Sequence, residues 1–334
     1  MMSNTQTPIT PSILSLLNQV DGIEKHTQAQ LQRSDGYCNE LIEVELPGGD
    51  ALILKRARFD WVDARLRASR AAASLLRRRT GVLAPAHLDV EHDADGRAIE
   101  VYWRIPLPTL KELWGTIPDR RRPQALRSWG ALLRRVHKAL PGRYGQLHEH
   151  AEDHRIEQHL RADLRDRLQP AITTVWPRAL PAVDLLLQRI DRIGERLAAR
   201  PAVLVHSDFH MGNVLCEERP RSIRCVGVID LESAWAGPPE ADVAQLQVLH
   251  GRAFNHALPP DWFTHFAAGY GSPLDPELLG FFRILQLLNL GYFAAISGWS
   301  KHVADLEAEL KREINGCLTG AGAAFSPDQP DRLL

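Results

Sequence analysis

The stretch from residue 203 to residue 232, VLVHSDFHMGNVLCEERPRSIRCVGVIDLE, constrains the fold of this chain more than any other segment. A short apolar run at 203–205 predicts a strand, and residues 206–212 predict a tight loop. The chain then becomes extended, turns in a polar segment at 217–222 and returns through a second apolar run at 223–229. The pattern predicts a hairpin directly after the loop, with the end of the hairpin lying beside the loop.

Polar side chains occupy the loop and the far end of the hairpin. Asp208 lies on the exposed turn, Asn213 ends the loop, and Asp230 follows the second strand. A converging amide oxygen and carboxylate are hard ligands, which suit Mg²⁺ better than zinc. Asp208 then remains to orient a hydroxyl group during phosphoryl transfer. The alternative is an ordinary hairpin loop in which Asp208 and Asn213 cap their own backbone.

The order Asp, Asn, Asp resembles that of a known family. The motif H-S-D-F-H-M-G-N, which starts at His206, and the motif I-D-L-E, which ends at Glu232, resemble those of the aminoglycoside phosphotransferase and choline kinase group of the protein-kinase-like superfamily. The resemblance implies an α+β fold of two lobes, a small antiparallel β lobe over residues 1–104 and a larger, mainly helical lobe over residues 105–334. It also implies ATP and Mg²⁺ as cofactors. The apolar pattern predicts a leading helix at 13–20, helices at 125–140 and 183–199 and four more beyond residue 239, and Pro106 and Pro108 predict the end of the last strand of the small lobe.

The resemblance further implies roles for individual residues. Lys55 ends a predicted strand at 51–55 and is expected to reach the nucleotide phosphates, although a single lysine at a strand end is usually solvated. Asp242 is expected to brace the loop, and it also suits a plain helix start. The implied roles are nucleotide binding by Gly36, Lys55, Trp103 and Ile105, catalysis by Asp208, metal binding by Asn213 and Asp230, support of the loop by His206 and Asp242, and a second-metal or outer-shell role for Glu232.

One helix departs from the family pattern. It is predicted from about residue 61 to residue 79, and the family usually carries a glutamate near its middle to pair with the lysine. Residues 69–74, Ser-Arg-Ala-Ala-Ala-Ser, contain no carboxylate. Asp60 and Asp63 fall at the helix start, where they also suit the helix dipole. The usual partner of Lys55 is therefore missing, and Asp63 is the substitute to test.

Composition favours a soluble enzyme. The chain has 334 residues and a formal net charge of −1, so charge does not favour a nucleic-acid partner. No signal peptide is visible, and polar residues interrupt the longest apolar run, at 284–299, which predicts a buried helix instead of a membrane span. We expect a cytoplasmic monomer or homodimer whose cysteines stay reduced, with Cys216 and Cys225 facing each other on the hairpin.

A histidine cluster precedes the predicted loop. It lacks a third convergent ligand and an H-E-x-x-H motif, which disfavours a zinc site. By resemblance, the region from about 146 to 181 shapes the acceptor pocket, so these histidines would lie near the substrate. The cluster consists of His148, His150, His154 and His159.

The expected function is transfer of the ATP γ-phosphate to a hydroxyl group of an antibiotic or related natural product, which would make the protein a resistance enzyme. A polycationic aminoglycoside requires an acidic cleft, whereas Glu149, Glu152 and Asp153 are interleaved with histidines and Arg155. A metabolic amino-alcohol or sugar kinase, similar to choline or homoserine kinases, is the first alternative. A nucleotide-binding pseudokinase that acts as an interaction protein is the second, because of the missing helix carboxylate. Transfer of AMP is the third.

Overall fold

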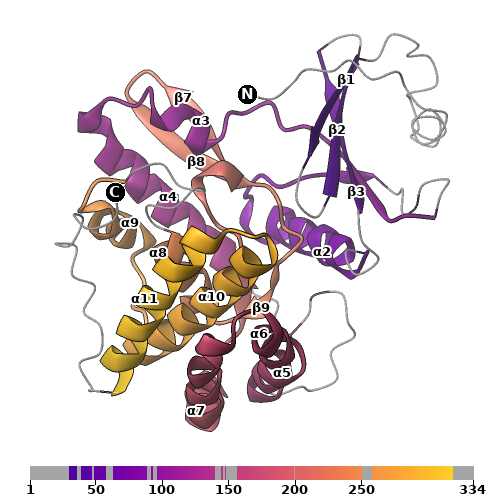
Figure 1. The fold of residues 1–334 in the computed structure, drawn as a ribbon. Coiled ribbons are helices and arrows are strands. Elements are labelled where there is room, and N and C mark those ends of the chain that lie inside the picture. Colours follow the sequence, from indigo (N-terminus) through magenta and orange to yellow (C-terminus); the bar gives the residue numbers. More distant parts are fainter. Residues whose placement is uncertain are drawn as a thin grey trace.

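The structure, a computed structural model, shows a small sheet beside a larger helical region (Figure 1). Several sequence predictions lie outside the described residues, namely the leading helix at 13–20, Gly36, Cys38, Asp60, His148, His150 and His154. The described residues are 30–35, 39–46, 49–57, 63–88, 92, 96–139, 144–145, 147, 156–198, 200–249 and 258–318.

Five strands form the small antiparallel sheet, in the spatial order β1-β2-β3-β5-β4. Helix α2 (Asp63–Thr80) is inserted between β3 and β4, and its Leu66 packs with Ala57 of β3 and with Ala98, next to β5. This arrangement confirms the predicted small antiparallel lobe with one inserted helix. The strands are β1 (Gln30–Asp35), β2 (Asn39–Glu45), β3 (Ala51–Ala57), β4 (His87–Leu88) and β5 (Ile99–Trp103).

An extended segment leads from β5 into the helical region. The backbone N–H of Arg104 still donates to β3, over 2.8 Å, and Pro106 and Pro108 then stiffen the chain because proline fixes φ. Helix α3 (Leu110–Trp114) follows at once, with a capping box at Thr109. The sheet therefore ends where the prolines predict.

Two antiparallel ladders carry the predicted loop and hairpin. Strand β6 (Val203–Val205) pairs with β9 (Trp235–Gly237), and β7 (Val214–Arg219) pairs with β8 (Ser222–Val228). A single turn of 3₁₀ helix, η5 (Met211–Asn213), joins the loop to β7. The predicted hairpin is thus confirmed, and both of its ends lie next to the loop.

The rest of the region is helical, as its apolar periodicity predicts. The helices predicted at 125–140 and 183–199 are α4 and α7, and the four predicted beyond residue 239 are α8 to α11 of the described chain. Helix α5 continues into a π-helical turn, η3, an irregularity that is frequent at functional sites. The helices are α4 (Arg122–His137), α5 (Ile156–Ala162), α6 (Gln169–Val175), α7 (Leu180–Ala198), α8 (Glu240–Leu249), α9 (Trp262–Tyr270), α10 (Pro276–Ile296) and α11 (Ser300–Leu318), and the shorter turns are η2 (Asp119–Arg121), η3 (Asp163–Leu168) and η4 (Pro177–Ala179).

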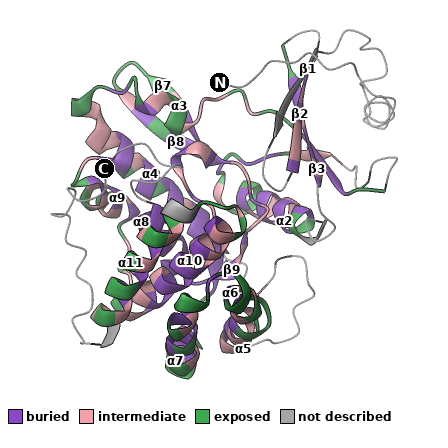
Figure 2. Ribbon diagram, viewed as in Figure 1, coloured by how far each residue is buried: buried purple, intermediate pink, exposed green. Residues whose placement is uncertain are grey.

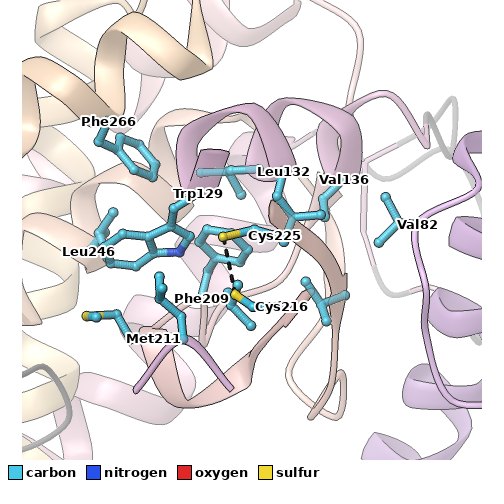
Figure 3. Close-up of a cluster of buried hydrophobic side chains, with 14 of the residues drawn as sticks. Val82, Trp129, Leu132, Val136, Phe209, Met211, Cys216, Cys225, Leu246 and Phe266 are labelled. Carbon is cyan, nitrogen blue, oxygen red and sulfur yellow. Dashed lines mark hydrogen bonds between the residues drawn. The ribbon is translucent and has the colours of Figure 1, made fainter. Parts of the chain in front are cut away.

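A buried aromatic cluster ties the loop to the helices. The indole of Trp129, on α4, stacks on Phe209 of the loop at a centroid distance of 6.1 Å and meets Phe266 of α9 edge-on at 5.4 Å (Figure 3). Figure 2 shows that the inner parts of α4 and α10 are largely buried. Packed aromatic pairs of this geometry are stabilising beyond the area that they bury. Phe209 therefore holds its loop against the core.

Cys216 and Cys225 belong to the same cluster. They are register partners on β7 and β8, and their sulfur atoms lie 3.5 Å apart (Figure 3). Both are buried free thiols. The predicted facing pair on the hairpin is confirmed.

Two glycines let α4 and α9 cross at close range. A Cβ atom on Gly130 would lie 2.0 Å from the carbonyl oxygen of Phe266, and one on Gly269 would lie 1.9 Å from that of Arg127. Both distances are far inside van der Waals contact, so these positions have no room for a side chain. The crossing brings Tyr270, the last residue of α9, next to α4.

Helix α10 contains most of the apolar run at 284–299. Within the described part of the chain it is the helix whose length and mean hydropathy would suit a membrane span, and 44% of that window is buried inside the protein. Leu278, Phe282 and Leu288 join the second hydrophobic cluster, together with residues of α7 and α8. The predicted buried helix of the larger region is present here.

Candidate active site

The loop that follows β6 has a constrained backbone. Ser207 has φ of 61° and Asp230, at the end of the hairpin, has φ of 62°. A side chain other than glycine in this left-handed region costs roughly 1–3 kcal/mol and needs surrounding contacts to hold it. The neighbouring residues supply such contacts to Ser207.

Asp242, near the start of α8, is the main anchor of the loop. Its fully buried carboxylate accepts hydrogen bonds from the backbone N–H groups of His206, over 2.9 Å, and Ser207, over 2.8 Å. Nε2 of His137 lies 3.0 Å from the same carboxylate, and the other ring nitrogen lies 2.9 Å from the hydroxyl oxygen of Tyr270. A chain of polar contacts thus connects the loop to α4 and α9.

Two further side chains hold Ser207 and the residues after it. Gln245 donates to the carbonyl oxygen of Ser207 and accepts from the backbone N–H of Phe209 over 3.2 Å. The indole N–H of Trp235 donates to Oγ of Ser207 over 2.8 Å. His206 is fully buried, and its Nε2 lies 3.0 Å from the carbonyl oxygen of Ile229 on the hairpin. The loop is therefore fixed on both sides.

Asp208 is the loop residue whose carboxylate reaches the cleft. Its side chain is 38% exposed, and Nδ2 of Asn213 donates to its Oδ2 over 3.0 Å. Nδ2 of Asn213 also donates to the backbone carbonyl oxygen of Asp208, which leaves Oδ1 of Asn213 without a hydrogen bond from the described residues. Asp208 and Asn213, both predicted, are thus adjacent, and each has an oxygen that accepts no hydrogen bond from the residues that the structure describes.

Lys55 joins the sheet to the hairpin. Its Nζ lies 2.6 Å from Oδ1 of Asp230 and 3.8 Å from Oε2 of Glu232, to which Asn39 also donates. Burial alone would lower the pKa of Lys55, but the negative charge of Asp230 raises this pKa well above its ordinary value. Burial alone would raise the pKa of Asp230, but Lys55 lowers it. Both groups are therefore charged at neutral pH.

Glu100 is a charged residue of this site that the sequence reasoning missed. It lies on β5 directly opposite Lys55 in the sheet register and is 1% exposed. A carboxylate inside the apolar strand I-E-V-Y-W was the available signal, because such a residue must find a buried partner. Asp63, the predicted substitute partner of Lys55, begins α2, and its side chain lies outside the described part of the chain.

The two predicted adenine-side residues lie apart from these groups. Trp103 ends β5, is 37% exposed and lines a small hollow of about 190 Å³ together with Gly49, Asp50 and Pro106. Ile105 follows in the extended segment and lines neither this hollow nor the main cleft. The adenine contacts therefore stay predictions.

The main cleft lies between the sheet and the helical region. Its volume is about 670 Å³, and Lys55, Asp208, Asp230 and Glu232 line it at one end. Helices α5, α8 and α10 and the turn η3 supply most of the remainder, and β2, α2, the loop and the segment at β9 add Asn39, Leu41, Arg65, Ser207, Ser233 and Trp235. Residues of that part include His159, Leu160, Asp163, Arg167, Trp235, Val248, Leu249, Phe282, Leu285, Gln286, Asn289, Leu290 and Phe293.

Comparison with known proteins gives a family match and several similar folds. Residues 30–282 match the model of the phosphotransferase enzyme family. The structure of aminoglycoside phosphotransferase APH(4)-Ia aligns with a TM-score of 0.64 at 18% identity, over 90% of this chain and 98% of that one. A thermostable mutant of that enzyme, in a ternary complex with AMP-PNP and hygromycin B, aligns at 0.63 and 19% identity, over the same shares.

A second enzyme gives a similar result. The GDP complex of wild-type aminoglycoside 2'-phosphotransferase-IIIa aligns with a TM-score of 0.60 at 15% identity, over 91% of this chain and 98% of that one. At these identities the structural matches establish the shared fold. No curated protein sequence matches this chain significantly.

Proposed function

Because this chain belongs to the phosphotransferase enzyme family, we propose that it transfers the γ-phosphate of ATP to a hydroxyl group of a small molecule. The observation that carries the proposal is that Lys55, Asp208 and Asp230, from separate parts of the chain, line one cleft, and that Asn213 is hydrogen-bonded to Asp208. Phosphoryl transfer requires little more than charge neutralisation and a positioned carboxylate. The cytoplasm, which supplies ATP, is the proposed site of the reaction.

The donor set fits a magnesium ion bound together with nucleotide. Asn213 offers an amide oxygen that accepts no hydrogen bond from the described part of the chain, and Asp230 offers a carboxylate. No group of three or more His, Cys, Asp or Glu side chains in the described ranges could hold a metal by itself. Mg²⁺ commonly uses one or two protein carboxylates and completes its shell with phosphate oxygens and water. When bound, Mg²⁺ neutralises the phosphate charge that develops during transfer.

Asp208 is the proposed catalytic residue. The hydrogen bond from Asn213 fixes its Oδ2, and its Oδ1 accepts no hydrogen bond from the described residues. Oδ1 is therefore placed to accept the hydroxyl proton of the acceptor and to align its oxygen with the γ-phosphate. Lys55 is placed to bind the phosphates. Glu232, which accepts a hydrogen bond from Asn39, is proposed to stay outside the first coordination shell of the metal.

We call the part of the cleft formed by α5, η3, α8 and α10 the acceptor side. The charge of its side chains argues against a polycationic acceptor. Apart from Asp208, Asp230 and Glu232, Asp163 is the one acidic residue among the described residues that line the cleft. Arg167 neutralises it through two hydrogen bonds, of 2.5 Å from Nε and 2.8 Å from Nη2. A polycationic aminosugar would find few unpaired negative charges there to replace its hydration.

The surface of the same side favours an apolar acceptor. Leu290 and Phe293 of α10 line it and are partly exposed, and the buried Val248, Leu249, Phe282 and Leu285 of α8 and α10 complete its apolar lining. The indole of Trp235 faces the imidazole of His159 at a centroid distance of 5.6 Å, with a small tilt. We therefore propose a mainly apolar natural product with a reactive hydroxyl, antibiotics included, as the acceptor class.

The experiment is Mg²⁺-dependent transfer from γ-labelled ATP to hydroxyl compounds sorted by charge, run beside Asp208→Asn. The neutral and singly charged arm contains apolar natural products, and the polycationic arm contains hygromycin B and kanamycin. We expect a labelled product in the first arm with the wild type alone. Labelling confined to the polycations would refute the acceptor class but keep the kinase. A protein that neither transfers label nor binds nucleotide would refute the kinase itself.

A matched variant tests the charge argument directly. Arg167→Gln removes the partner of Asp163 and leaves its carboxylate facing the cleft. We expect binding of hygromycin B to tighten in this variant by about tenfold, because a cation gains an unpaired carboxylate. Equal binding by the variant and the wild type would show that the Asp163 pair does not select against polycations.

A further inference from the structure

A buried carboxylate stands opposite Lys55 inside its own sheet. Strands β3 and β5 are antiparallel, and Lys55 stands directly opposite Glu100 in their register. Side chains of facing residues in such a pair leave the same side of the sheet, with Cβ atoms roughly 5 Å apart. Lys55 is 5% exposed and Glu100 is 1% exposed, so the two charges share one buried environment.

Residues from two other elements hold Glu100. Nε2 of His87, on β4, lies 2.5 Å from Oε1 of Glu100. Ser69, which is 2% exposed near the middle of α2, lies close to the same carboxylate and helps to lower its pKa. Burial alone would raise the pKa of Glu100, but the contact with His87 and the charge of Lys55 lower it. Ser69 opens the stretch 69–74, in which the family usually carries the glutamate that pairs with the lysine.

The other two carboxylates near Lys55, those of Asp230 and Glu232, face the cleft, where metal and nucleotide are proposed to bind. Asp230 and Glu232 follow the hairpin and line the cleft, and Asp230 is the proposed metal ligand. A carboxylate that coordinates a cation has less charge to offer a neighbouring ammonium group. Glu100 does not line the cleft, so neither metal nor substrate competes for it.

We infer that Glu100 positions Lys55 for the nucleotide phosphates and replaces, from β5, the glutamate that α2 lacks. The inference rests on the proposed nucleotide-dependent function. Glu100 acts through Lys55 and touches no reacting atom, so it is a positioning residue. The lysine can release Asp230 when nucleotide and metal arrive, since Glu100 still balances its charge.

Affinity for ATP tests the inference without an identified acceptor. For Glu100→Gln, titrated with ATP and Mg²⁺, we expect the dissociation constant to rise about tenfold. Glu40→Gln is the matched control, because Glu40 on β2 pairs with Arg56, the residue after Lys55, with N and O atoms 3.9 Å apart. We expect this control to bind ATP as the wild type does.

Exchange of two residues separates positioning from a structural role. Ser69→Glu combined with Glu100→Ser moves the carboxylate from β5 to α2 at a site where the two side chains lie close together. If the carboxylate serves Lys55, the exchanged protein binds ATP more tightly than Glu100→Ser alone, and its affinity approaches that of the wild type. If Glu100 merely ties β4 to β5, the exchange gives no recovery, and the inference fails.

The comparison with the wild type keeps the two proposals apart. A wild-type protein that binds no ATP refutes the proposed function. A wild-type protein that binds ATP, together with a Glu100→Gln protein of equal affinity, refutes the positioning role alone. Thermal unfolding of each variant shows whether it is folded, and a folded Glu100→Ser protein is the baseline for the exchange.

Discussion

Asp242→Asn is the substitution that tests most directly how the loop is held. The carboxylate accepts three hydrogen bonds, from the N–H groups of His206 and Ser207 and from His137. The amide keeps one acceptor oxygen and turns the other position into a donor. In the less costly orientation of the amide, its NH₂ group faces the N–H of Ser207, which then has no acceptor. The N–H of His206 and the ring of His137 keep an acceptor oxygen, but that oxygen is no longer charged.

The expected loss of stability follows from these contacts. A hydrogen bond to a charged acceptor contributes about 1.5–3 kcal/mol, and a neutral one contributes about 1 kcal/mol. One lost hydrogen bond and two weakened ones lower the free energy of unfolding. A neutral amide is easier to bury than a charge, which offsets part of this, so we expect a net loss of about 3 kcal/mol. For a chain of this length that corresponds to a fall of about 6 °C in Tm.

The assay combines thermal unfolding with phosphate transfer to the acceptor that the labelling experiment identifies. We expect kcat to fall about 100-fold, since a shifted loop misplaces Asp208. Asp184→Asn, on an exposed position of α7, is the control and should leave both quantities unchanged. A Tm within 1 °C of the wild type together with an unchanged kcat would refute the claim that Asp242 holds the loop.

Three other changes have defined outcomes. Asp208→Asn should lower kcat by about 1000-fold with little change in ATP affinity, and turnover near the wild-type rate would exclude it as the catalytic residue. Asp275 caps α10 by accepting from the N–H groups of Glu277 and Leu278, so Asp275→Ala should cost about 1 kcal/mol in urea unfolding at pH 7, and Asp275→Asn much less. Burial opposes ionisation of Asp275, but these N–H groups lower its pKa, so its stabilising effect is complete above the ordinary carboxyl pKa and is lost as pH falls through the lowered value; a difference between wild type and Asp275→Ala that did not shrink in acid would contradict this. Gly269→Ala should lower the yield of folded protein or the Tm by several degrees, because its methyl group meets the Arg127 carbonyl oxygen, and an unchanged Tm would show that the helices separate easily.

The sequence predicted the parts of the site that depend on short-range patterns. The loop, the hairpin and the facing pair Cys216 and Cys225 follow from alternation and turn residues within thirty positions, and all are present. The resemblance, in turn, indicated that Asp242 braces the loop. Its two backbone contacts to the loop agree with that expectation.

The missed parts depend on contacts between distant segments. Lys55 and Asp230 are separated by 175 positions, and no local pattern shows which carboxylate meets the lysine. The strand I-E-V-Y-W marks Glu100 as a buried carboxylate, but its place opposite Lys55 follows only when β3 and β5 are known to be neighbours in a specific register. Asp63, the candidate partner on the helix, has a side chain outside the described residues, so that part of the expectation stays a prediction. The pair Asp163 and Arg167, four positions apart, fits ordinary helical spacing, but its place in the cleft could not be known before the cleft was defined.

The crossing of α4 and α9 has a consequence for how this protein can vary. Gly130 and Gly269 contact no substrate, yet the spacing that they permit sets the position of Tyr270, which meets His137 and, through it, Asp242. In a library of all single substitutions selected for activity, we expect both glycines to tolerate as few replacements as Asp208. Sequence divergence among descendants of this protein should then be slow at the crossing of α4 and α9 as well as in the cleft.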